Sequence, residues 1–168
     1  MRDSPSACVA DANVIIDLHV GGLLPKALRH PFQLVAPDFI TDELVNPSGK
    51  SLVREGLQEQ GLTPEEINNE LPELKARYPS DLSINDLAAL FVAKKMGLML
   101  LTGERLLRQA AEAEGVTVRG TLWLLNHMVS RKVVPPRRAA EAIVRIRRVR
   151  HHLHGRNAEQ LLARWRRG

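Results

Sequence analysis

The stretch SINDLAALFVAKKMGLMLLTGERLLRQAAEAEGVTV, residues 83–118, decides the fold class. Its apolar residues first recur at helical spacing and stop at Gly97, a residue typical of helix C-caps. The run LMLLT (98–102) then predicts a short strand, and a second helical segment leads into another predicted strand, VTVRG (116–120). Strands that alternate with helices in this way form parallel sheets, because each crossover helix returns the chain to the same edge.

The same alternation extends toward the N-terminus. ACVA (7–10) and FQLVA (32–36) read as strands, a helix is expected over 13–19, and another begins at Pro37-Asp38 and runs until Pro47. Residues 50–78 predict polar helical pieces interrupted by Gly and Pro. We therefore expect an α/β protein with three layers, α/β/α, around a short parallel sheet.

The C-terminal part predicts a helical extension. Thr121 is expected to cap a helix, and Pro135-Pro136 marks a boundary. Beyond it, an apolar stripe from Ala139 to Leu153 is surrounded by arginines, and a last short helix follows Gly155. We predict one domain over residues 1–134 and a basic amphipathic helical tail over residues 135–168.

Composition limits the cellular setting and the kind of site. At 168 residues the chain is long enough for one well-buried core. Its single cysteine, Cys8, excludes a disulfide framework and any multi-cysteine metal site. No apolar run approaches the ~18 residues that a spanning helix needs, and the N-terminal residues lack the pattern of a signal peptide. We expect a cytoplasmic protein with no membrane partner.

Charge is distributed unevenly along the chain. Residues 131–168 hold twelve Lys/Arg against two Glu, a net of +10, whereas residues 1–130 carry a net of −5. Such asymmetry indicates a polyanionic partner, and RNA bound through Arg145, Arg147, Arg148 and Arg150 is the hypothesis. The alternative is a solvated arginine face on a docking helix.

Four carboxylates are candidates for a common site: Asp11, Glu43, Asp86 and Glu104. Each also has an ordinary structural explanation. Asp11 is placed to cap the helix at Asn13, Asp86 completes a capping box with Ser83, and Glu104 falls in a first helical turn. Glu43 could simply face solvent.

Topology favours a shared role for these acids. Residues that follow parallel strands lie at one edge of the sheet, which holds the ligand crevice in open α/β proteins. Asp11 and Glu104 follow strands directly, and Glu43 and Asp86 lie on helices beside the same edge. Carboxylates gathered there would repel one another without a cation, and an all-oxygen ligand set points to Mg²⁺ or Mn²⁺.

The motifs DANVIIDL, PDFITDEL, LSINDLAALFVA and LLTGERLLRQAAEAEGVTVRGT together resemble the PIN domain, a metal-dependent nuclease fold found in many VapC-type toxins of toxin–antitoxin pairs. The run from TGE (102–104) through the Gly-Thr at 120–121 into a helix most resembles a bacterial and archaeal PIN subgroup often known only as a domain of unknown function. The resemblance covers residues 7–134 in the family's order and spacing.

The resemblance implies a Mg²⁺- or Mn²⁺-dependent endoribonuclease, with a cognate antitoxin as a further partner and homodimers as a common state. It makes Asp11, Asp86 and Glu104 metal ligands and Glu43 a fourth catalytic acid. The family more often has Asp where Glu104 stands. The resemblance also makes Asn13 the small polar residue that supports Asp11, and Ser83 and Thr102 match polar positions that hold the acids by hydrogen bonds.

Two other functional classes are open at this point. A PIN-like protein that has lost hydrolysis would act as an RNA- or protein-binding module, with the apolar stripe of the tail as its interaction face. A phosphatase of the HAD type needs a second acid two residues after Asp11, where this chain has Asn13. Asp17 is a second choice as a ligand, because it falls on another part of its helix, and HHLH (151–154) is expected to be solvated surface.

Overall fold

A computed structural model describes residues 5–78 and 81–167 of the chain. Its described residues contain a sheet of five parallel strands in the order β3-β2-β1-β4-β5, so that β1 lies at the centre. The strands are β1 (Ala7–Ala10), β2 (Gln33–Pro37), β3 (Gln58–Gln60), β4 (Met99–Leu101) and β5 (Val118–Arg119).

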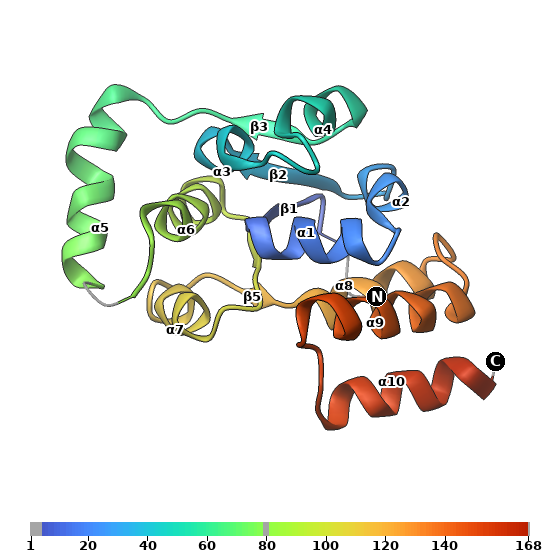
Figure 1. The fold of residues 1–168 in the computed structure, drawn as a ribbon. Coiled ribbons are helices and arrows are strands. Elements are labelled where there is room, and N and C mark those ends of the chain that lie inside the picture. Colours follow the sequence, from blue (N-terminus) through green and yellow to red (C-terminus); the bar gives the residue numbers. More distant parts are fainter. Residues whose placement is uncertain (1–4, 79–80, 168) are drawn as a thin grey trace.

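Helices cover both faces of this sheet (Figure 1), which confirms the expected three-layer α/β/α class. They are α1 (Ala12–Val20), α2 (Leu24–Leu28), α3 (Asp38–Glu43), α4 (Gly49–Glu55), the π-helix η1 (Glu66–Glu70), α5 (Leu71–Arg77), α6 (Ile84–Met96), α7 (Arg105–Ala113), α8 (Thr121–Ser130), α9 (Pro136–Arg150) and α10 (Arg156–Arg167). Helix α6 packs across β1, β2 and β4.

Local signals place most of these elements correctly. Gly97 ends α6 in the left-handed conformation, which glycine adopts without steric cost. The strand β3 was not predicted, because its residues Gln58–Gln60 are polar and lie at the sheet edge. The prediction that Thr121 caps α8 is wrong: Gly120 occupies the N-cap, and the Thr121 hydroxyl bonds elsewhere.

The C-terminal helices are joined to the body by apolar contacts. Ala139, Ile143 and Ile146 of α9 are buried, and α9 packs against α1, whereas Val149 of the predicted stripe is 60% exposed. Helix α10 lies outermost, on the far side of α9 from α1 (Figure 1). The division at residue 134 stays a prediction. Within the described ranges, no helix is both long and apolar enough to cross a bilayer.

Candidate active site at the carboxyl edge of the sheet

The candidate site begins where the two central strands end. Asp11 follows β1, and its backbone N–H donates to Leu101 O of β4 at 3.1 Å. Thr102 follows β4 and is fully buried. These two positions face one another because β1 and β4 are paired in parallel register.

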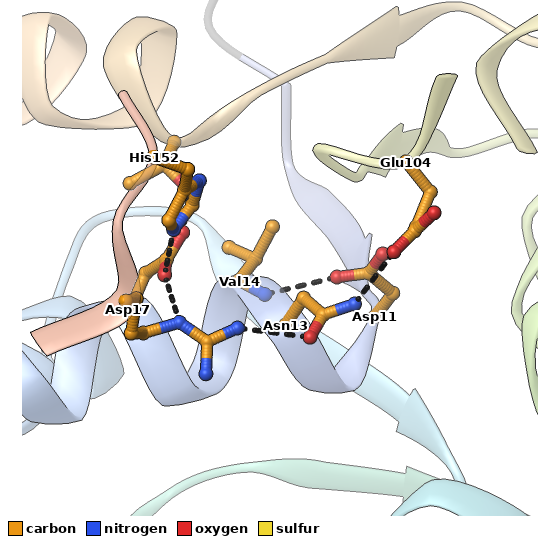
Figure 2. A network of polar contacts seen from close by, with 8 residues as sticks. Asp11, Asn13, Val14, Asp17, Glu104 and His152 are labelled. Carbon is orange, nitrogen blue, oxygen red and sulfur yellow. Dashed lines mark hydrogen bonds and ion pairs between the residues drawn. The ribbon is translucent and has the colours of Figure 1, made fainter. Parts of the chain in front are cut away.

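Asp11 is a buried carboxylate with two neutral hydrogen-bond donors. Only 2% of the residue is exposed. Its Oδ1 accepts from Val14 N–H at 2.9 Å (Figure 2), which confirms the predicted N-cap of α1. Its Oδ2 accepts from the Thr102 hydroxyl. Burial raises the pKa of Asp11 to about 6, the Thr102 and Val14 bonds lower it, and the charges of Asp86 and Glu104 raise it.

Glu104 is held beside Asp11 from two sides. Its backbone N–H donates to Thr102 Oγ1 at 3.1 Å, so Thr102 bonds both segments. Its exposed carboxylate accepts from Asn13 Nδ2 at 3.3 Å. Thr102 therefore contacts both acids, as expected, whereas Asn13, which was expected to support Asp11, bonds Glu104 instead.

Asp86 approaches from the N-terminal end of α6. The Ser83 N–H donates to Asp86 Oδ2 at 3.0 Å and the Asp86 N–H donates to Ser83 Oγ at 3.1 Å, so the predicted capping box is present. This reciprocal pair fixes the Asp86 carboxylate at the helix start. The charge of Asp86 contributes to the raised pKa of Asp11, after the larger effect of burial.

Glu43, the last residue of α3, stands at the rim. Its Oε2 accepts from Asn85 Nδ2, a partner that sequence reasoning missed. Glu43, Asn85, Asp86 and Asn13 line a shared groove of about 450 Å³. The "ND" pair at 85–86 was a usable signal, because both residues lie in the first turn of a helix that points at this edge.

The acids share one edge without forming a closed ligand shell. Across residues 5–78 and 81–167, no three His, Cys, Asp or Glu side chains converge on a point where a metal ion would bind. The expected cluster is therefore looser than predicted, since like charges separate and each acid accepts hydrogen bonds from the protein. Carboxylates from three segments still match the oxygen ligands that Mg²⁺ and Mn²⁺ prefer, and a cation would offset the repulsion at Asp11.

A second polar cluster surrounds Asp17, which lies one helical turn after Asn13 on α1. Asp17 is 1% exposed. Its Oδ2 accepts from Thr121 Oγ1 at 2.8 Å, and its Oδ1 accepts from Arg150 Nε and His152 Nε2, each at 2.7 Å (Figure 2). The expectation that HHLH is solvated surface is thus corrected for His152, whose ring packs onto a buried acid.

The four tail arginines have different surroundings. Arg147 donates to Glu159 at 2.6 Å and to Leu153 O at 2.9 Å, and Arg150 donates to Asp17 and Asn13. Arg145 and Arg148 are exposed. These two line a shallow groove of about 350 Å³ together with Arg137 and Arg166. The hypothesis of RNA binding thus stays a prediction, with Arg145 and Arg148 better placed for it.

Comparison with known proteins now identifies the fold family. A profile of the DUF3368 family, described as a PIN domain, matches residues 7–167. The chain belongs to the PIN-domain family. PIN domains are in general nucleases, and the match includes α9 and α10.

Structural comparison gives a distant similarity. A PilT N-terminus domain protein from the hyperthermophilic archaeon Sulfolobus solfataricus P2 is 12% identical, with a TM-score of 0.45, over 89% of this chain and 99% of that one. The search of curated proteins found no match.

Proposed function

We propose that this PIN protein is an endoribonuclease that hydrolyses RNA phosphodiester bonds with Mg²⁺ or Mn²⁺. The observation that carries the proposal is the Asp11 carboxylate, placed after the central strand, destabilised mainly by its burial and further by the neighbouring Asp86 and Glu104 charges. Such an arrangement is unfavourable for the protein alone and favourable around a divalent cation.

In this proposal Asp11, Asp86 and Glu104 hold the cation and Glu43 faces the substrate groove. When bound, Mg²⁺ or Mn²⁺ supplies an activated water and shields charge on the phosphate. Thr102 and the Val14 N–H orient Asp11, while the Ser83 capping box orients Asp86. No side-chain nucleophile is required.

The direct test is cleavage of a fluorescent single-stranded RNA with Mn²⁺ and with EDTA. Wild type should cleave only with Mn²⁺, and Asp11→Asn should lose activity while its circular dichroism spectrum stays unchanged. Asp42→Asn is the matched control, because Asp42 is exposed and adjacent to Glu43. Wild-type turnover in EDTA, or an active Asp11→Asn protein, would contradict the proposal.

RNA affinity in this proposal comes from the exposed arginines of the basic groove, above all Arg145 and Arg148. Arginines that bind phosphates release counterions, so affinity falls with salt. Replacing both with Gln should weaken RNA binding and flatten its salt dependence. Each single replacement is also compared with Arg138→Gln, which removes one charge from the same helix at a position where the arginine pairs with Glu141. An unchanged slope in the double variant would remove this groove from the proposal.

A PIN-like protein without hydrolysis, serving as an RNA- or protein-binding module, is the second candidate. It is favoured by the absence of a converged three-ligand group among the described residues. Mn²⁺ titration separates the two candidates, because a nuclease site binds Mn²⁺ and turns over RNA, whereas a degenerate site does neither.

Three further proposals concern the protein in its cell. The nuclease acts as the toxin of a toxin–antitoxin pair, forms a homodimer and works in the cytoplasm. Light scattering after size exclusion tests the dimer. Growth arrest on expression, relieved by a small protein encoded immediately upstream, tests the toxin and the antitoxin together.

A further inference from the structure

A chain of hydrogen bonds joins the end of α9 to the acidic edge. Arg150, the last residue of α9, donates from Nε to Asp17 Oδ1 at 2.7 Å and from Nη2 to Asn13 Oδ1 at 2.9 Å. Asn13 Nδ2 in turn donates to Glu104 Oε1 at 3.3 Å. Figure 2 shows Asn13 between the Asp17 cluster on one side and Asp11 with Glu104 on the other.

From this arrangement we propose that Arg150 is a positioning residue for the metal site, acting through the Asn13 amide on the Glu104 carboxylate. The inference rests on the proposed function, because it concerns how one of the proposed ligands is held.

The chemistry of the two side chains gives the bond chain its direction. A guanidinium has only hydrogen-bond donors, so it can bond to an amide in one orientation only, with the amide oxygen facing it. Arg150 thereby fixes Asn13 with its NH₂ group turned toward the acids, where it meets Glu104. Without Arg150 the amide is free to turn over, and its oxygen would then face the Glu104 carboxylate, an unfavourable contact.

The guanidinium itself is firmly placed. Asp17, which is 1% exposed, anchors it, and Asn13 and Asp17 lie four residues apart on one face of α1, so that one Arg150 reaches both. His151 ends α9 in the left-handed conformation at φ 55°, and the chain then turns back so that His152 also contacts Asp17. A free RNA-binding arginine would have no such set of partners.

Glu104 needs this restraint more than the other acids do. Its carboxylate is exposed and stands on three rotatable bonds, whereas Asp11 is buried and Asp86 is held by a capping box. Outer partners that orient a ligand typically change metal affinity by about 10- to 100-fold when removed. Arg150 therefore sets how well Glu104 contributes to cation binding.

The test measures Mn²⁺ affinity of the full-length protein without RNA, from the electron paramagnetic resonance signal of free Mn²⁺. Arg150→Gln should raise the Mn²⁺ dissociation constant about tenfold. Asn13→Ala should raise it similarly, and the double variant should show no further increase, because both changes break the same chain. Arg138→Gln, which removes the same charge from α9, should leave the constant unchanged.

A double variant serves as the control for loss of folding. Since Arg150→Gln leaves Asp17 buried with fewer donors, Asp17→Asn combined with Arg150→Gln removes the stranded charge and still lacks the contact to Asn13. Both variants should bind Mn²⁺ more weakly, at temperatures well below their unfolding transitions.

The opposing outcomes are distinct. An unchanged Mn²⁺ constant with a higher KM for RNA and a flatter salt dependence would show that Arg150 binds substrate, and would overturn the positioning role. If wild type binds Mn²⁺ and the variants bind it with the same dissociation constant, this inference alone is overturned. Wild-type protein that binds no Mn²⁺ overturns the proposed function as well.

Discussion

Asp11 caps the N-terminus of α1 and Asp17 lies in the second half of the same helix, and these two buried carboxylates have partners that differ in charge. Asp11 has a hydroxyl, a backbone N–H and two neighbouring acids. Asp17 has a guanidinium, an imidazole and a hydroxyl. The hydrogen-bond partners of Asp11 are neutral, whereas Asp17 forms an ion pair with Arg150. Among the described residues, Asp11 is thus a buried acid without a cationic partner, whereas Asp17 is one that the fold has already neutralised.

The largest stability effect should follow from breaking the neutralised cluster. Asp17→Ala removes the partner of Arg150, whose side chain is only 23% exposed, and should destabilise the protein by about 3 kcal/mol. Urea unfolding measures this change. Asp42→Ala, at an exposed position, should change the free energy of unfolding by less than about 0.5 kcal/mol. Equal effects at the two positions would mean that the Asp17 cluster adds no stability.

Adding the missing charge should stabilise the Asp11 end. Mn²⁺ at 100 times its dissociation constant should raise the free energy of unfolding by about 2.7 kcal/mol, because it binds the folded state. Thermal unfolding of wild type with and without Mn²⁺ measures this gain, which Asp11→Asn should lose. A similar gain in Asp11→Asn would place the cation elsewhere.

Removing the uncompensated charge should also stabilise the metal-free protein. The folded pKa of Asp11, about 6, is above its ordinary value of 3.8, so its contribution to stability is full below pH 3.8 and is lost as pH rises through 6. Asp11→Asn should therefore gain about 3 kcal/mol over wild type at pH 7 in EDTA and about 0.5 kcal/mol or less at pH 4. Urea unfolding at both pH values checks the sign, and a loss at pH 7 would contradict it.

The smallest effect is expected where an arginine pair is open to water. Arg147 of α9 and Glu159 of α10 form an ion pair in which the Glu159 side chain is 63% exposed. Glu159→Gln should cost about 0.5 kcal/mol or less in urea unfolding, and salt should reduce the difference. A cost near that of Asp17→Ala would show that burial is not what distinguishes the two pairs.

Local chemistry made much of the site predictable. The Asp11 cap and the Ser83–Asp86 capping box are short-range patterns, and both are present as expected. The parallel topology also brought Thr102 against Asp11. Asn85 and Asp17 were missed or ranked low, because their partners Glu43 and Arg150 come from other segments.

The sequence by itself determined the class of fold and the edge at which the acids gather, because hydrophobic periodicity and strand order act over short stretches. Only the tertiary structure decided which of the twelve basic residues in the tail meets the buried Asp17. Arg150 meets Asn13 across 137 positions of sequence, and no local pattern distinguishes it from exposed Arg148. Packing of α9 against α1 makes that choice, since it brings one arginine, and not its neighbours, to a buried acid that requires a partner.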